Sequence, residues 1–320
     1  MNIVRATEYN IRKAADIIRN GGLIAFPTET VYGLGADALN PSASAGIFEA
    51  KKRPFFDPLI VHIAEISGIE RIAKNIDRRG QSLMEKFWPG PLTIVLEKKD
   101  IVPDIVTSGL STVAVRMPVH PAARDLIRYS ETPIAAPSAN RFGCLSPTTA
   151  EHVYNQLGDS VDIILDGGQC SVGIESTIIK IMNNRIYLLR HGGTSPEEIE
   201  EFTGETIIME KIQEAPEAPG QLPYHYSPEK RLILVDKIIP DDENCGYLFF
   251  RKPSVPFPVE RSRILSETGN IREAASNLFS HLHWLDMLEI DTIYAEKIDG
   301  SGLGAAIMDR LKKASMKYNL

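Results

Sequence analysis

The sequence predicts an α/β protein of two domains joined by a proline-rich segment. Short apolar runs typical of buried strands alternate with segments in which apolar residues recur at helical spacing. The segment QEAPEAPGQLPYHYSP, from Gln213 to Pro228, carries four prolines and little apolar periodicity, as an extended linker does. The 320 residues, 43% hydrophobic and 24% charged, suffice for two packed cores. We expect domains at 1–207 and 230–320, with a linker at 208–229.

Helix and strand patterns follow one another along the first domain. Thr7 is placed to cap a helix that ends at Gly21. Strand patterns follow at LIAF, PLIVHI, LTIVLEK, TVAVRMP, PIAAPSAN and VDIILDGG, and helical patterns at PSASAGIFEAKK, HPAARDLIRYS and SPTTAEHVYNQLG. Ser146 or Thr148 is expected to cap the last of these helices, and Gly158 to end it. The run ESTIIKIMNNRIYLLR predicts a hairpin turning at Asn183–Asn184, and Ser195 with Glu198 has capping-box spacing.

The second domain repeats the alternation on a smaller scale. The strand patterns RLILVD, GYLFFR and TIYAEKI are interleaved with helical patterns near 271–288 and at AAIMDRLKKAS. This alternation predicts a small, mostly parallel sheet. The run GSGLGAA resembles a dinucleotide fingerprint, but its third glycine comes one place early, so a tight turn is the favoured interpretation.

Charge and cysteine content exclude several classes of protein. The net charge is −7, with 21 Lys and Arg against 26 Asp and Glu in residues 1–210 and 14 against 16 in the remainder. Such a balance predicts weak or no direct binding of nucleic acid. The three widely spaced cysteines argue against a disulfide framework and a structural zinc site, and indicate a reducing cytoplasm. The sequence shows neither an apolar signal core nor 18 consecutive apolar residues, so we expect no membrane contact.

Polar side chains follow the first apolar strand at once, in the stretch FPTETVYGLG. If strand alternation continues past Pro27, Thr28 and Thr30 share one face with Phe26, and Glu29 lies on the other. Hydroxyls followed by glycines suit a polar small molecule, although an ordinary strand entering a glycine turn explains the pattern equally well.

Comparable clusters follow other apolar strands. Arg116 is expected on one strand face with Thr112, and its charge needs an anionic partner, either an internal carboxylate or a ligand. His62, taken alone, is better explained as a satisfied core histidine than as a ligand. The other candidates are Lys51, Arg53, Ser138, Asn140, Ser146, Ser176 and Arg190. Arginines and hydroxyls in such a set can bind a polyanion such as a nucleoside triphosphate without a GxxxxGK[ST] loop, which the sequence lacks.

The ordered motifs PTETVYGLG, KxRP…PLIVHI, VRMP, PSAN, SPT and DGG…GIESTI resemble those of the YrdC-type threonylcarbamoyl-adenylate synthases. HYSP at His225–Pro228 and GLGAAIMDRLKKAS resemble the longer, two-domain members. The resemblance implies an open twisted mixed sheet around a deep basic cavity, plus a small Rossmann-like α/β domain. It also implies condensation of L-threonine, bicarbonate or CO2, and ATP with Mg²⁺ to threonylcarbamoyl-AMP and pyrophosphate. A downstream transferase would then modify tRNA beside the anticodon.

The same resemblance assigns roles to particular residues. Thr30, His62, Arg116 and Ser176 would hold threonine, with Arg116 on its carboxylate. Lys51, Arg53, Asp57, Thr112, Ser138, Asn140, Ser146 and Arg190 would hold ATP, with Lys51 and Arg53 as the catalytic cations, and no metal site built by the protein alone is expected. Tyr224, His225 and Tyr226 would close over the substrates as a lid.

Three positions depart from the family pattern. Asp57 stands where an Asn usually precedes PLIVH, RHGG at 190–193 replaces RPG, and NRFGC replaces N-x-S-G-x. The alternatives are a carbamoyl-adenylating module, disfavoured because cysteine clusters are lacking, and an RNA-binding module, disfavoured by the acidic balance.

Overall fold

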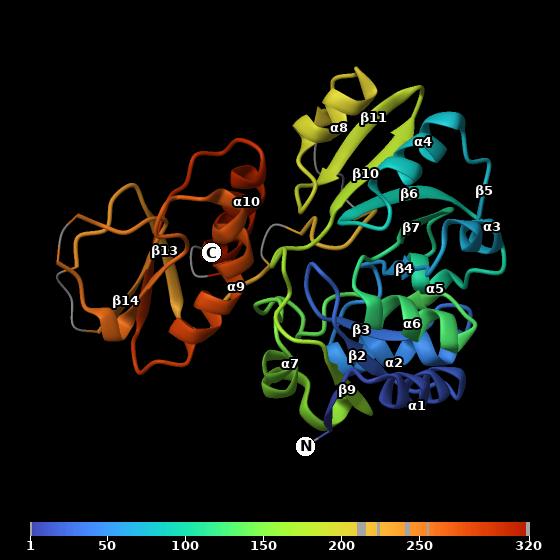
Figure 1. Ribbon diagram of the computed structural model, residues 1–320, viewed down its shortest axis with the longest axis horizontal. Helices are drawn as coiled ribbons and strands as arrows, with labels where there is room; N and C mark the ends of the chain where they lie inside the picture. The colour runs from blue at the N-terminus through green and yellow to red at the C-terminus, as the bar shows by residue number, and fades with distance from the viewer. Residues whose placement is uncertain (1, 210–215, 223–224, 241–243, 255, 318–320) are drawn as a thin grey trace.

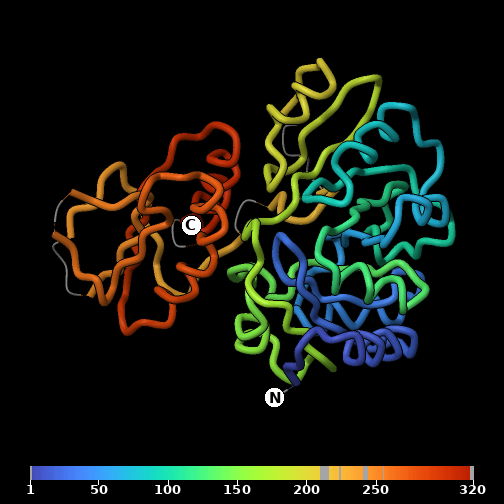
Figure 2. The backbone as a smooth tube through the Cα atoms, in the orientation of Figure 1, coloured from blue at the N-terminus to red at the C-terminus, as the bar shows by residue number. Residues whose placement is uncertain are grey.

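The computed structural model describes residues 2–209, 216–222, 225–240, 244–254 and 256–317, which form two units with separate sheets (Figure 1). The smaller unit lies to the left in Figure 1 and the larger to the right. Figure 2 shows the chain passing along the larger unit beyond residue 216 before it enters the smaller one. None of the helices among these residues is long and apolar enough to cross a membrane.

The larger unit contains a mixed sheet. Its strands are β1 (Ile3–Arg5), β2 (Ile24–Phe26), β3 (Gly33–Asp37), β4 (Ile60–His62), β5 (Ala73–Lys74), β6 (Leu92–Lys98), β7 (Thr112–Arg116), β8 (Ile134–Ala135), β9 (Ile163–Asp166), β10 (Thr177–Met182), β11 (Arg185–Arg190) and β12 (Ile208–Met209). Their order is β1-β9-β2-β3-β8-β4-β7-β6-β10-β11-β12, with β5 beside β6. Because β12 pairs with β11, this sheet extends two residues past the expected boundary at 207.

Helices cover this sheet: α1 (Glu8–Arg19), α2 (Pro41–Lys51), α3 (Ile69–Ile72), α4 (Arg78–Phe87), α5 (Asp104–Thr107), α6 (Pro121–Ser130), α7 (Ala150–Leu157) and α8 (Pro196–Thr203). Thr7 caps α1 as expected, and Ile11 and Ile18 of α1 share a buried cluster with Leu126 of α6. The capping box predicted at Ser195 and Glu198 is present on α8.

The order and register of the central strands place three polar side chains together. β4 runs parallel to β7 with His62 opposite Arg116, and β6 runs antiparallel to β7 with Thr93 opposite Arg116. Segments far apart in sequence therefore meet at one end of three adjacent strands.

The smaller unit confirms the predicted parallel sheet. Its strand order is β13 (Arg231–Val235), β16 (Thr292–Glu296), β14 (Cys245–Phe249) and β15 (Ser262–Ile264), and the three ladders are parallel. Helices α9 (Ile271–Asp286) and α10 (Leu303–Met316) pack against each other.

The two units share one apolar core. Val31, Leu145 and Ile174 of the larger unit are buried in the same cluster as Leu278 and Phe279 of α9. A Cβ at Gly173, whose φ is +74°, would meet the backbone of Ser276 in α9 at 2.5 Å. Close backbone packing of this kind fixes the units to each other.

Two local expectations were wrong. Helix α7 is capped by Thr149, which accepts from the His152 N–H, and not by Ser146 or Thr148. Ser146 is unsuited to capping because its hydroxyl is bonded to Glu175. The strand expected at PIAAPSAN contributes only Ile134–Ala135 to the sheet, and Pro137 two residues later has no N–H to donate.

Candidate active site

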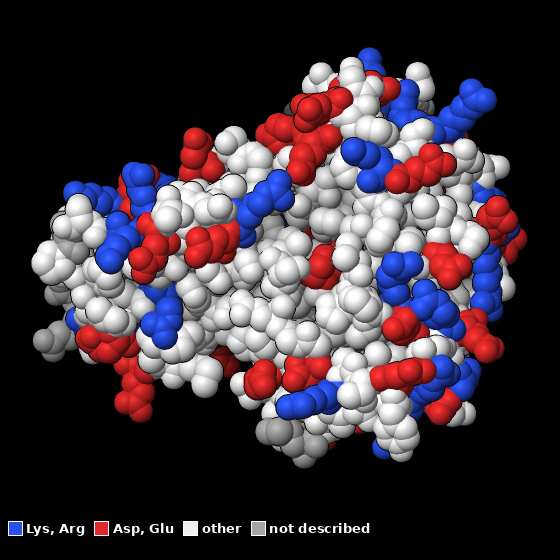
Figure 3. Space-filling model, in the orientation of Figure 1, with Lys and Arg blue, Asp and Glu red and all other residues white. Residues whose placement is uncertain are grey.

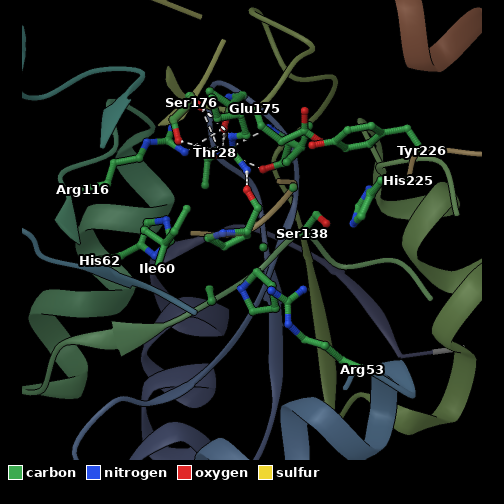
Figure 4. A pocket seen from close by; sticks show the side chains of 18 residues that line it. Thr28, Arg53, Ile60, His62, Arg116, Ser138, Glu175, Ser176, His225 and Tyr226 are labelled. Carbon is green, nitrogen blue, oxygen red and sulfur yellow. Dashed lines mark hydrogen bonds between the residues drawn. The ribbon is translucent and has the colours of Figure 1, made fainter. Parts of the chain in front are cut away.

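A single cavity brings together most of the residues singled out in the sequence (Figure 4). The space in it that the centre of a water molecule can occupy is about 40 Å³. It is lined by Thr28, Thr30, Val31, Gly33, Arg53, Ile60, His62, Arg116, Ala136, Pro137, Ser138, Glu175, Ser176, Arg190, Pro219, Gly220, His225 and Tyr226. Three arginines against one glutamate make the lining basic, as expected.

The loop between β2 and β3 forms one wall of the cavity, but not in the predicted way. The sheet pairing of β2 ends at Phe26, so the alternation does not continue past Pro27. The Thr28 hydroxyl lies 2.9 Å from the Thr30 hydroxyl and donates to the carbonyl of Val31, which closes a turn. Glu29 and Thr30 consequently reach the same partner instead of lying on opposite faces.

That partner is Arg116, at the end of β7. Its Nη2 donates to Glu29 Oε1 at 2.5 Å, its Nη1 to Thr30 Oγ1 at 2.8 Å, and its Nε to the carbonyl of Gly90 at 3.3 Å. The internal-carboxylate alternative for its charge is therefore confirmed, and because Arg116 also lines the cavity, a contact with a ligand anion stays a prediction. An arginine offers five N–H groups, so two remain for a ligand.

His62 lies beside Arg116 with 4% of its surface exposed. Burial, with Arg116 nearby, lowers the pKa of the imidazole to about 3, so the ring is neutral at pH 7. Its Nδ1 has no hydrogen-bond partner among the described residues. His62 lines the cavity although this nitrogen is itself buried, so a role of His62 in ligand binding stays a prediction.

Ser176 and Arg190 form another part of the lining. The Ser176 hydroxyl lies 2.7 Å from that of Thr93, and Arg190 Nη2 reaches it at 3.1 Å. Arg190 also donates to the carbonyls of Ser176, at 3.0 Å from Nε, and of Pro219, at 2.9 Å from Nη1. These contacts hold the guanidinium in place, and one N–H group of Nη1 takes no part in them.

Arg53 occupies the floor of the cavity. Helix α2 ends at Lys52, whose left-handed backbone (φ 52°) turns the chain before Arg53. Arg53 Nη2 pairs with Asp57 Oδ2 at 2.9 Å and Nε donates to the Asp57 carbonyl at 2.9 Å, which leaves both N–H groups of Nη1. Asp57 itself is fully buried and does not line the cavity.

Two aromatic side chains of the linker complete the cavity, together with Pro219 and Gly220. His225 and Tyr226 line it and contact each other at 4.2 Å between ring centroids, and burial lowers the pKa of His225 well below its ordinary value. In Figure 4 they lie across the cavity from Arg116 and His62. Tyr224, the third predicted lid residue, is outside the described residues.

Four more predicted residues lie outside the lining. Lys51 donates to the carbonyls of Ser138 and Asn140, so it supports the wall from behind. Asn140 bonds the carbonyls of Arg141 and Cys144, and Ser146 bonds Glu175. Thr112 begins β7 at the end remote from Arg116, four residues or about 13 Å away along the strand.

Sequence reasoning missed two carboxylates, Glu29 and Glu175. Both occur inside quoted motifs, PTETVYG and GIESTI, but their partners are distant in sequence: Arg116 for Glu29, and Arg310 of α10, 2.9 Å away, for Glu175. Among the residues that the structure describes, none form a cluster of three His, Cys, Asp or Glu able to hold a metal ion.

Comparison with known proteins extends over nearly the whole chain. A family model described as "Telomere recombination" matches residues 16–192, and one described as "Threonylcarbamoyl-AMP synthase, C-terminal domain" matches residues 194–316. The threonylcarbamoyl-AMP synthase of Pyrococcus abyssi is 44% identical over 326 residues, covering 97% of this chain and 95% of that protein. That of Bacillus subtilis is 39% identical over 320 residues, covering 95% and 92%.

Solved structures agree with these matches. The crystal structure of P. abyssi Sua5 complexed with L-threonine superimposes with a TM-score of 0.89 at 42% identity, covering 98% of this chain and 96% of that one. A full-length HypF structure, at 19% identity and a TM-score of 0.52, covers 58% of this chain and shares the fold of the larger unit.

Proposed function

The chain belongs to the family of two-domain threonylcarbamoyl-AMP synthases, and on that premise we propose that its cavity condenses L-threonine, bicarbonate or CO2, and ATP to threonylcarbamoyl-AMP and pyrophosphate. The observation that carries this proposal is the convergence of Arg53, Arg116 and Arg190, each no more than 6% exposed, on one small cavity lined by hydroxyls. Buried arginines with unused N–H groups are suited to phosphates and carboxylates.

The chemistry requires no protein nucleophile. The threonine amine adds to CO2 and loses a proton, giving a carbamate. A carbamate oxygen then attacks the α-phosphorus of ATP, the bond from that phosphorus to the bridging oxygen breaks, and pyrophosphate leaves. What the protein supplies is alignment of two anions and neutralisation of their charge.

The threonine end of the cavity is assigned to Thr30, His62, Arg116 and Ser176. Each of them lines the cavity, and His62 and Arg116 are neighbours across two strands. The two unused N–H groups of Arg116 match the two oxygens of a carboxylate. The neutral His62 can accept a hydrogen bond from the amine or hydroxyl of the substrate without adding charge.

The ATP end is assigned to Arg53, Ser138 and Arg190, which line the cavity. Lys51, Asp57, Asn140 and Ser146 support this wall from behind, so we assign them a positioning role within the ATP site. Thr112 lies farthest from the lining residues, and its contact with ATP is the least supported of these assignments.

Closure of the site is assigned to the linker. His225 and Tyr226 line the cavity opposite the threonine end. Side chains that cover the cavity there would exclude water from the product, which is a reactive mixed anhydride. The predicted role of Tyr224 remains a prediction.

Mg²⁺ is expected to enter with ATP as part of the substrate. The one carboxylate in the lining, Glu175, is already bonded to Ser146 and Arg310, so phosphate oxygens suit the ion better than the described side chains. When bound, Mg²⁺ would neutralise the leaving pyrophosphate.

The product is an activated acyl phosphate, which implies a downstream transferase that passes the threonylcarbamoyl group to the adenosine beside the anticodon of tRNA. We place this step in the cytoplasm, where tRNA is modified. On the face seen in Figure 3, basic and acidic side chains are interspersed, which favours delivery through the transferase over strong direct tRNA binding.

The decisive experiment measures pyrophosphate release from Mg-ATP, with threonine and bicarbonate omitted in turn. Release that requires both co-substrates supports the proposal. Release that needs carbamoyl phosphate instead would favour a carbamoyl-adenylating enzyme. A salt-sensitive RNA gel shift with no turnover would favour an RNA-binding module.

A further inference from the structure

One arginine of the smaller unit contacts residues that line the cavity of the larger one. Arg310 of α10 is 1% exposed and has the largest of the fully buried side chains described. Its Nε donates to Glu175 Oε2 at 2.9 Å, and its Nη1 to the carbonyl of His191 at 2.7 Å and to Asp309 Oδ2 at 2.9 Å. Its guanidinium carbon lies 5.1 Å from the ring centroid of Tyr226.

Glu175 is the carboxylate of the cavity lining, and its charge is unfavourable for a site that must accept a triphosphate. Burial alone would raise the pKa of Glu175, but Arg310 and Arg190 outweigh burial and hold it below the ordinary value. The residue is therefore ionised, and its charge is compensated principally by Arg310.

The same helix also holds the linker. Lys313 Nζ donates to the carbonyl of Gly220 at 2.7 Å and pairs with Asp309 at 2.9 Å. Gly220 and Tyr226 both line the cavity, so α10 contacts the linker at two of its cavity-lining positions.

We propose that Arg310, from the second unit, is a positioning residue for adenylate formation: it neutralises Glu175 in the cavity wall, so that the site accepts the ATP polyphosphate. This inference rests on the proposed function and assigns the second unit a direct part in it. Without Arg310, the Glu175 charge would repel ATP strongly and zwitterionic threonine weakly.

The test compares the full-length variants R310M, R310K, E175Q and E175Q/R310M by steady-state pyrophosphate release. R310M should raise KM for Mg-ATP about tenfold or more while KM for threonine changes less than about threefold. R310K, which keeps the charge, should recover most of that loss. E175Q should not raise KM for ATP, because the remaining Arg310 is attractive, and the double variant should return KM for ATP to within about threefold of wild type.

The control is R272Q. Arg272 of α9 makes another ion pair between the units, with Glu198 at 3.4 Å, but is exposed and does not line the cavity. It should leave both KM values unchanged.

Three outcomes overturn the inference: an unchanged KM for ATP in R310M, equal rises in R310M and E175Q, or no rescue in the double variant. Should R310M fail to fold, E175Q and E175Q/R310M are compared instead, because a charge role predicts near-normal KM for ATP in both, whereas a role of Arg310 beyond neutralising Glu175 predicts a rise in the double variant. Wild-type protein that releases no pyrophosphate would instead contradict the proposed function, which separates the two failures.

Discussion

Replacing Arg116 by lysine should weaken threonine binding selectively. Arg116 donates one N–H group each to Glu29, Thr30 and Gly90, so two of its five N–H groups remain for the substrate carboxylate. A lysine has three N–H groups in all, so it can satisfy the protein acceptors or the carboxylate, but not both. Losing one charge-assisted hydrogen bond is worth about 1.5–3 kcal/mol, which corresponds to a rise of about 10- to 150-fold in KM for threonine.

The assay is pyrophosphate release at saturating ATP and bicarbonate with threonine varied. KM for ATP should change less than about threefold, and the melting temperature should stay near that of wild type because lysine keeps Glu29 paired. The matched control is R124K, since Arg124 also donates to a backbone carbonyl, of Ala64 at 3.2 Å, but does not line the cavity. An unchanged KM for threonine in R116K would refute the assignment of Arg116 to the carboxylate.

Other consequences of the structure can be measured separately. G192A should lower stability by about 3 kcal/mol, because its Cβ would lie 2.2 Å from the Ser176 carbonyl carbon; a wild-type melting curve would contradict this. G220A, with φ +83° and a Cβ 2.6 Å from the Tyr226 hydroxyl, should raise KM for ATP by displacing the linker, and unaltered kinetics would contradict the lid assignment. The free energy of unfolding should fall between pH 6.5 and pH 4 because of the stacked pair His152 and His283. Burial lowers the pKa of His283 to about 4, so as the pH falls this histidine is protonated in the unfolded chain before it is protonated in the folded protein. Urea unfolding should show up to about 3 kcal/mol of this loss for His283, and H283N should reduce it; an equal loss in H283N would exclude the pair as its source.

The local sequence pattern predicted which helices and strands are present better than it predicted the residues at which they end. The hairpin at Asn183–Asn184 follows from two residues that tolerate positive φ, 51° and 60° here, and is confirmed. Alternation along TVAVR correctly gave a strand carrying Arg116. It failed after Phe26, where bonds of the Thr28 hydroxyl turn the chain before the strand pattern ends.

The sequence predicted most residues of the candidate site, but not which of their side chains pair with one another. The family motifs assigned roles to nine of the residues now found in the cavity lining, namely Thr30, Arg53, His62, Arg116, Ser138, Ser176, Arg190, His225 and Tyr226. Nothing local in the sequence pairs Glu29 with Arg116, or Glu175 with Arg310, because these partners are 87 and 135 residues apart. The periodicity of apolar residues cannot predict contacts between side chains that meet only when the sheet and both units have assembled.

The shared core between the units has a consequence for biosynthesis. Residues 2–209 leave the ribosome before α10 exists, and the roughly 100 residues that separate β12 from Arg310 take about 5–20 s to translate. Until α9 has been translated, Val31, Leu145 and Ile174 have no apolar partners from it, and until α10 has been translated Glu175 has no counter-charge from Arg310. The nascent larger unit therefore lacks the cover of α9 over these apolar residues, and the contacts of Arg310 with Glu175 and Tyr226 form only when α10 has been translated and docked.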